Sequence, residues 1–215
     1  MSADTPHRQL KEKLRQERAD LILDMAEEVL AEKGYHDSSM DEIATRTGVA
    51  KGTLYQHFPS KEDLVFALFE RNLALFEQTV AQAAASTSTA RARLERILRY
   101  VYQERRGPHT QLLQLLYHNV DIRKGLIEKK EQLRNRLERV ALQIRAILEE
   151  GKADASFDSA ISTELMLLTF MSALALSGRE QMLAQKQLSP EELVTQVGRI
   201  FFEGIASKQL STRQL

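Results

Sequence analysis

Apolar side chains recur at helical spacing along most of this chain. The first stripe precedes a glycine, and its members are Ile22, Met25, Ala26, Val29 and Leu30. Side chains three and four residues apart share one face of a helix, so this stripe predicts an amphipathic helix packed on a core. Gly34, which follows Lys33, predicts where that helix ends.

A second short helix is predicted directly after residue 39. Ser39 is a candidate N-cap, and Glu42 lies three residues later, which is the pattern of a capping box. Gly48 supplies the left-handed conformation that ends a helix and redirects the chain. The pattern therefore predicts a helix of about two turns followed by a tight turn.

The next helix, expected at residues 51–57, separates apolar from polar side chains. Leu54 and Phe58 lie four residues apart and can face a core together. The polar side chains point elsewhere, and they are Lys51, Thr53, Tyr55, Gln56 and His57. A helix, a glycine turn and a second, polar helix form the layout of a helix-turn-helix that reads DNA.

The remainder of the chain continues the helical pattern. Residues 61–84 are apolar almost all round, which predicts a helix buried on several sides that joins a small domain to a larger one. Further helices are expected at residues 91–105, 109–118, 126–150, 159–185 and from residue 189 onward, with a loop at residues 121–125. Ser189, Pro190 and Glu192 together form a complete helix start.

Composition indicates an ordinary globular protein of one or two domains. The chain has 215 residues, of which 43% are hydrophobic and 28% charged. It has no cysteine, which excludes disulfides, thiolate catalysis and cysteine metal sites. The N-terminus lacks the pattern of a signal peptide, and the apolar run at residues 165–176 is too short to span a bilayer. We therefore expect a cytoplasmic protein.

The formal net charge of zero does not by itself indicate a nucleic-acid partner, so any such partner requires a local basic patch. One segment before the first stripe qualifies, and its basic residues are Arg8, Lys11, Lys13, Arg15 and Arg18. Two interpretations stay open for this segment, a solvated helix face and an arm that contacts phosphates.

Residues 38–64 carry a series of residue types at fixed spacing. They are Ser38-Ser39, Ile43-Ala44, Gly48-Val49-Ala50, Gly52-Thr53-Leu54-Tyr55, His57-Phe58, Lys61 and Leu64. The series resembles the signature of the TetR/AcrR family of bacterial transcriptional regulators, and the close match covers about residues 26–69. Ala50 departs from it, because the family usually has Ser or Thr there, whose side-chain cap contributes about 1 kcal/mol.

The resemblance implies an all-α fold of about nine helices in two domains. Residues 1–70 would form a three-helix DNA-binding domain, with the helix-turn-helix motif at 39–58. Residues 71–215 would form a larger domain for ligand binding and dimerisation. A homodimer of this kind binds a palindromic double-stranded DNA operator, most often as a repressor, and a small lipophilic effector releases it.

The resemblance also implies roles for individual residues. DNA contacts are expected from Ser39, Lys51, Gly52, Thr53, Tyr55, Gln56, His57 and Lys61. Gln56 occupies a position that varies with the operator, and Lys61 lies near a helix N-terminus as a phosphate contact. The ligand pocket is expected to include Phe76, Tyr100, Tyr102, His109, Leu113, Tyr117 and Met171. The dimer interface is expected on the last two helices, at Leu167, Phe170, Leu174, Val197 and Phe201.

Other chemistries find little support in the sequence. His109 and His118 are nine residues apart, on opposite faces of a helix, and cannot share a metal there. The segment at residues 48–53 lacks the ending of a phosphate-binding loop. We therefore expect no enzyme activity, no cofactor and no membrane partner. A different class stays open, a helical ligand-binding or protein-interaction module that keeps the fold without binding an operator.

Overall fold

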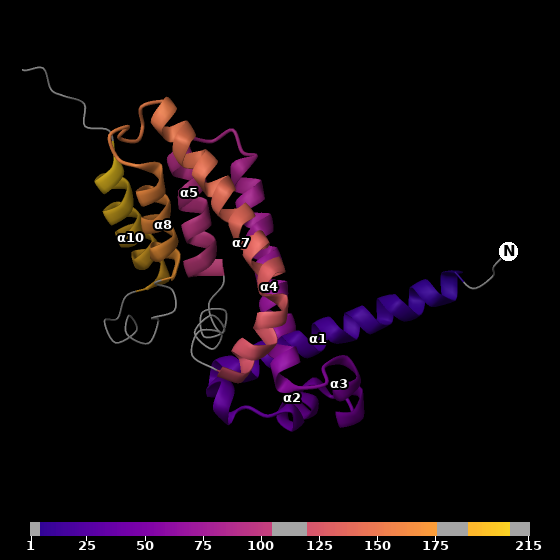
Figure 1. The fold of residues 1–215 in the computed structure, drawn as a ribbon. Helices are drawn as coiled ribbons and strands as arrows, with labels where there is room; N and C mark the ends of the chain where they lie inside the picture. Colours follow the sequence, from indigo (N-terminus) through magenta and orange to yellow (C-terminus); the bar gives the residue numbers. More distant parts are fainter. Residues whose placement is uncertain (1–4, 105–119, 176–188, 207–215) are drawn as a thin grey trace, which may run out of the picture. The chain divides into compact units, whose positions relative to one another are not determined.

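The computed structural model describes residues 5–104, 120–175 and 189–206, and every regular element in these ranges is helical (Figure 1). The elements are α1 (Thr5–Asp37), α2 (Met40–Thr47), α3 (Lys51–His57), α4 (Lys61–Ala84), α5 (Ala90–Arg99), a π-helical turn η1 (Tyr100–Glu104), α7 (Val120–Ala153), α8 (Thr163–Ala175) and α10 (Pro190–Ile205). The all-α class predicted from the sequence is confirmed.

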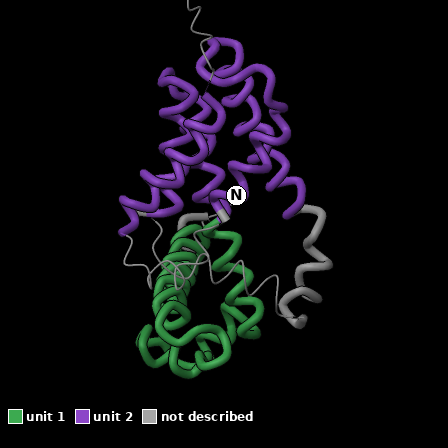
Figure 2. Tube along the Cα trace, turned by 90° about the vertical axis from the view of Figure 1, so that its left-hand side faces the viewer, with its two compact units in different colours: residues 1–72, 107–127 green, residues 73–106, 128–215 purple. Residues whose placement is uncertain are grey.

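The chain divides into two compact units (Figure 2). Within the described ranges, the first unit holds residues 5–72 and 120–127, and the second holds residues 73–104, 128–175 and 189–206. Helix α4 therefore contributes its first half to one unit and its second half to the other. The boundary at residue 70 expected from the sequence stays a prediction, and the first unit also includes residues 120–127.

The first unit packs α1, α2, α3 and the start of α4 around a small apolar core. Its fully buried side chains include Ile22, Leu30, Ile43, Leu54, Leu64 and Leu68. Regular helix geometry in α1 is interrupted at Gly34, whose φ of 76° is left-handed. The predicted break at this glycine is therefore confirmed.

The second unit has a larger core built from five helices. Its fully buried side chains include Val80, Leu94, Ile97, Leu98, Ile144, Leu148, Phe170 and Phe202. Helix α10 begins as predicted, because the Ser189 side chain accepts from the Glu192 amide while the Glu192 carboxylate accepts from the Ser189 amide. Among the described residues, no helix combines the length and the apolar character that crossing a membrane requires.

Three predicted boundaries need correction. Residues 121–125 are not a loop but the first turns of α7, because a single glycine costs a helix only about 1 kcal/mol and good helix formers surround it. The helix expected at residues 91–105 changes to π-helical geometry at Tyr100. The expected helix at 159–185 begins at Thr163, and its continuation past Ala175 lies outside the described residues, as does the helix expected at 109–118.

Candidate functional site

Helix α3 has one buried and one exposed face. Leu54 is fully buried and Phe58 is 8% exposed, so the prediction that this pair faces the core is confirmed. Tyr55 is 40% exposed, and Gln56 is exposed beside it. Lys51 and Gly52 are also exposed, whereas Thr53 and His57 are half-buried. A row of polar side chains therefore stands on the surface of this unit, held there by the packing of Leu54.

The turn before α3 has the geometry that the sequence predicts. Ser39 caps α2, where its exposed hydroxyl accepts from the Glu42 amide at 3.2 Å. Gly48 ends α2 with a φ of 75°. The Glu42 carboxylate is engaged by Lys33 and Arg46, so only the Ser39 half of the predicted capping box is formed. At Ala50, the N-cap of α3, no side-chain hydrogen bond is made, as expected for alanine.

Lys51 pairs with an acid of the preceding helix. Its ammonium donates to Asp41 Oδ2 at 2.7 Å, and both side chains are largely exposed. This hydrogen bond raises the pKa of Lys51 above its ordinary value, so the side chain stays charged. A phosphate contact from Lys51 therefore competes with Asp41.

His57 lies within the field of the basic segment on α1. Burial lowers the pKa of His57, and the charges of Arg15 and Arg18 lower it further. Arg15 and Arg18 belong to α1, whose N-terminal end extends past α2 and α3 (Figure 1). The structure thus brings one end of α3 into the neighbourhood of the basic arm, a proximity that the sequence could not show.

Lys61 points into the protein. Its ammonium donates to the Ser38 carbonyl at 2.6 Å and to the Tyr35 carbonyl, and it lies 4.2 Å from the centre of the Tyr35 ring. Burial lowers the pKa of Lys61 below its usual range. Lys61, which was expected as a phosphate contact, therefore donates to backbone carbonyls.

The residues expected in a ligand pocket are partly described. Phe76 on α4 and Tyr100 at the start of η1 stack with their ring centres 6.3 Å apart, and Met171 is half-buried beside the core. Tyr102 is 3% exposed and donates its hydroxyl to the Ala173 carbonyl at 2.6 Å; burial raises its pKa to about 12. His109, Leu113 and Tyr117 lie outside the described residues.

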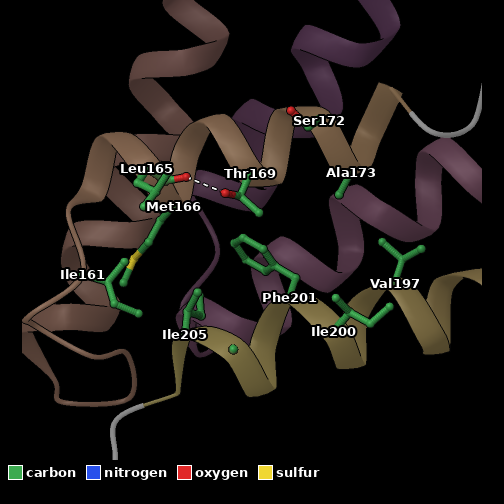
Figure 3. Close-up of a pocket in the computed structure, with 11 residues that line it drawn as sticks. Ile161, Leu165, Met166, Thr169, Ser172, Ala173, Val197, Ile200, Phe201 and Ile205 are labelled. Carbon is green, nitrogen blue, oxygen red and sulfur yellow. Dashed lines mark hydrogen bonds between the residues drawn. The ribbon is translucent and has the colours of Figure 1, made fainter.

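Helices α8 and α10 form an apolar groove of about 440 Å³ on the second unit (Figure 3). Its lining comprises Ile161, Leu165, Met166, Thr169, Ser172, Ala173, Val197, Ile200, Phe201, Gly204 and Ile205. The Thr169 hydroxyl donates to the Leu165 carbonyl at 2.8 Å, so it adds little polarity to the groove. Leu168 and Ile200, at 65% and 79% exposed, lie on these same two helices.

The expected interface residues divide into two groups. Phe170, Leu174 and Phe201 are buried in the core of the protomer, where Phe170 and Phe201 pack at 5.1 Å between ring centres. Side chains buried in this way present almost no surface to a partner. Leu167 and Val197 are half-buried against the same core. A dimer interface on these helices stays a prediction, and their exposed large apolar residues are Leu165, Leu168 and Ile200.

Among the described residues, no group of three or more histidine, aspartate or glutamate side chains is arranged to hold a metal ion. The polar chemistry of the first unit lies instead in α3, the basic arm and the ion pairs between its helices.

Comparison with known proteins gives a consistent result. Residues 22–68 match the bacterial regulatory proteins of the tetR family. The chain is 29% identical over 130 residues to the fatty acid metabolism regulator protein of Bacillus subtilis, and 45% identical over 80 residues to the transcriptional activator FasR of Mycolicibacterium smegmatis. These alignments cover 60% and 37% of this chain, and they span 66% and 36% of the two relatives.

A similar fold is found in the transcriptional regulator FadR of Bacillus subtilis, solved in complex with stearoyl-CoA. The TM-score is 0.63 at 22% identity, with 86% of this chain and 98% of the other covered. This likeness extends over both units, whereas the sequence match to the tetR family lies within the first.

Proposed function

Because the chain belongs to the tetR family of bacterial regulatory proteins, we propose that it is a DNA-binding transcriptional repressor that responds to a small lipophilic ligand. One observation carries this proposal: Leu54 and Phe58 anchor α3 so that Tyr55 and Gln56 stand exposed after a left-handed glycine turn. A short helix held in this way fits the major groove of DNA, which admits one α-helix.

The proposed DNA contacts divide into two kinds. Gln56 and Tyr55 lie on the exposed face of α3 and would read base edges, since a glutamine amide can make two hydrogen bonds to adenine. The residues around this face would contact phosphates, and these contacts would set the position of the first unit on the duplex. They are Ser39, Lys51, Gly52, Thr53 and His57. Arg15 and Arg18 on the arm would extend that phosphate surface.

The proposed assembly is a homodimer formed through α8 and α10. The groove between these helices is apolar, and Leu165, Leu168 and Ile200 on them are largely exposed. Apolar surface of this kind is favourably covered by a partner, and a second copy supplies the same surface under two-fold symmetry. A symmetric pair of heads would bind a palindromic operator, whose half-sites lie about 34–36 Å apart.

The proposed effector is a fatty acyl thioester or the corresponding acid. The structure of FadR from Bacillus subtilis contains stearoyl-CoA, and the second unit here offers an aromatic pair, Phe76 and Tyr100, beside an apolar core. Phe76 lies on α4, whose first half belongs to the first unit. Ligand binding that favours one position of α4 would change the separation of the two recognition helices, in proportion to its differential affinity.

A fluorescence anisotropy titration with DNA from upstream of the chain's own coding region tests the DNA-binding claim. We expect specific binding that weakens steeply between about 50 and 200 mM salt, because phosphate contacts release counterions. Tyr55→Ala should abolish specific binding, whereas Leu142→Ala, an exposed change on α7, should leave it intact. A folded protein that binds this DNA no better than a scrambled duplex would instead favour a ligand-binding module without an operator.

The effector claim requires a separate experiment. Stearoyl-CoA should lower DNA affinity at least about tenfold if it favours the unbound state by ~1.4 kcal/mol, and free coenzyme A should not. Specific DNA binding that stearoyl-CoA and stearate both leave unchanged would refute the effector class and leave the regulator assignment standing.

A further inference from the structure

Two backbone carbonyls and an aromatic ring enclose the ammonium of Lys61. The carbonyls belong to Tyr35, in the last turn of α1, and to Ser38, which follows α1. The ring is that of Tyr35, whose centre lies 4.2 Å from the lysine nitrogen. An ammonium has three donors, so two hydrogen bonds and one ring contact account for all of them.

The next residue of α4, Glu62, contacts Tyr35 through its side chain. The Tyr35 hydroxyl donates to Glu62 Oε1 at 2.6 Å. This hydrogen bond is the first cause of the lowered pKa of Glu62, so the carboxylate stays ionised. Lys61 and Glu62 together hold Tyr35 by its carbonyl, its ring and its hydroxyl, and we name this set of three residues the Tyr35 clamp.

The segment that is held in this way follows the break at Gly34, comprises the last turn of α1, and ends at the cap of α2. Tyr35 and Ser38 lie at the C-terminal end of α1, where the last carbonyls have no partner within the helix. Ser38 is buried, and its hydroxyl donates to the Tyr35 carbonyl at 2.9 Å. Ser39 follows directly and caps α2. The clamp therefore sets where α2 starts, and α2 leads through Gly48 into α3.

We propose that Lys61 is a positioning residue that fixes the helix-turn-helix through the Tyr35 clamp, and that it does not contact phosphate. This inference rests on the proposed function, because it concerns how the DNA-reading face is held. It reverses the sequence interpretation, in which Lys61 neutralises a phosphate. The reason is geometric, since a half-buried ammonium with all donors directed at the loop has none left for the duplex.

A second contact makes the clamp part of a rigid attachment. Further along α4, the Arg71 guanidinium donates to Asp24 at 2.6 Å and to Glu27 at 2.7 Å, both on α1. The first three turns of α4 are thus tied to α1 at residues 61–62 and again at residue 71. A shift of this part of α4 would carry the α1–α2 loop with it, and hence the start of α2.

Salt dependence of DNA binding separates a positioning lysine from a phosphate-contacting one. Removing one phosphate contact reduces the slope of log affinity against log salt by about one unit. Lys61→Gln should lower the affinity for the upstream DNA about tenfold or more while the slope stays at its wild-type value. Lys51→Gln is the matched control, an exposed lysine of α3 whose loss should reduce the slope. A reduced slope in Lys61→Gln would overturn the proposal.

Two further variants test the clamp without altering a lysine. Tyr35→Phe removes only the hydrogen bond to Glu62, and Glu62→Gln removes the charge that this hydroxyl meets. Neither group is a phosphate contact, yet both changes should weaken DNA binding severalfold at an unchanged slope. Wild-type affinity in both variants, with the fold intact by circular dichroism, would contradict the clamp.

Hydrogen exchange gives a readout that does not depend on DNA. The amides of Glu42 and Ile43 bond to Ser39, so they report the start of α2. They should exchange about tenfold faster in Lys61→Gln, while the Leu193 amide in α10 stays unchanged. If the wild-type chain binds no DNA, the proposed function fails but this measurement still decides whether the clamp exists. Equal exchange at Glu42 in wild type and variant would show that it does not.

Discussion

The contacts that stabilise each of the two units differ in their balance of charged pairs and apolar burial. The first unit has a small core and a series of charged contacts between its helices, including Arg46 with Glu32 and Glu42, Arg71 with Asp24 and Glu27, and the Tyr35 clamp. The second unit has a larger apolar core and exposed apolar side chains on α8 and α10, and its helices are also joined by the ion pairs Arg93–Glu150, Arg136–Glu77 and Arg145–Glu164. Charged contacts are directional, whereas apolar burial is not.

We expect this difference to affect two properties separately, the orientation of the helices and the free energy of unfolding. In the first unit, polar contacts add to the packing of Leu54 and Phe58 in fixing where α2 and α3 lie, so their loss should change DNA binding more than the free energy of unfolding. In the second unit, apolar burial supplies the stability, and its outward apolar surface supplies the proposed dimer contact. Substitutions in the two units should therefore fail in different assays.

Phe170→Ala should have the largest effect, on stability. The side chain is fully buried against Phe201, so its removal should lower the free energy of unfolding by about 3–5 kcal/mol. Urea denaturation measures this change. Leu168→Ala, two residues away but 65% exposed, should cost the protomer within about 0.5 kcal/mol. Equal losses at the two positions would contradict the burial of Phe170 and the exposure of Leu168 in the protomer.

Ile200→Glu should break the dimer without unfolding the protomer. Ile200 is 79% exposed on α10 and lines the groove with α8, so a carboxylate there would meet apolar surface in a partner. We expect a loss of about 2 kcal/mol or more in association, seen by light scattering as monomers at micromolar concentration. Arg199→Glu, on the neighbouring exposed position, is the control for added negative charge. A dimer of wild-type affinity in Ile200→Glu would exclude this face.

Lower pH should strengthen DNA binding through His57. Burial, Arg15 and Arg18 lower the pKa of this imidazole in the free protein, so it is neutral at pH 7. A phosphate favours the imidazolium, so binding should take up a proton and affinity should rise severalfold from about pH 8 to pH 6. His57→Gln should flatten this dependence. An identical pH profile in wild type and His57→Gln would exclude His57 as the phosphate contact.

The same lowered pKa has the opposite sign for folding. Below about pH 6.5 the unfolded chain binds a proton at His57. The folded first unit binds this proton less readily, because the pKa of His57 is lowered there. The contribution of His57 to stability is therefore present above that pH and is lost as the pH falls toward the folded pKa. Strengthened DNA binding together with weakened stability in acid would be the signature of this residue.

Asp41→Asn should have the smallest effect, and it should improve binding. Asp41 holds the Lys51 ammonium at 2.7 Å and adds a negative charge near the DNA-reading face. Its neutralisation should raise DNA affinity by about two- to fivefold, the range expected when an exposed ion pair is removed. Glu95→Gln, which breaks an exposed pair with Arg91 on α5, is the matched control. Weaker DNA binding in Asp41→Asn would mean that Asp41 positions Lys51 for its contact.

Local chemistry explains why much of the first unit could be predicted from the sequence. The cap at Ser39, the left-handed Gly48 and the Leu54–Phe58 spacing each act within a few residues, so the chain carries them in plain order. The Tyr35 clamp joins residues 26 positions apart, and no periodic pattern records such a pair. Its nearest signal was Gly34, which marks the break in α1 just before the residues that Lys61 binds.

Helix α8 shows why buried and exposed positions could not be distinguished from the sequence. It is apolar on nearly every face, so Phe170 and Leu168 look equivalent in the sequence. Their separation into core and surface depends on where α10 packs, which is a tertiary fact. The same holds for α7, where Gly125 predicts a break that the surrounding helix formers outweigh.

Selection of binding sites from random DNA tests the central claim most directly, because it requires the exposed face of α3 to read sequence. The wild-type protein should enrich a palindrome whose half-sites lie one helical turn, or a multiple of it, apart. Gln56→Ala should change the preferred base at one position in each half-site, at about 1–3 kcal/mol, with the spacing preserved. No enriched motif, or the same motif from Gln56→Ala and wild type, would contradict the assignment of this face.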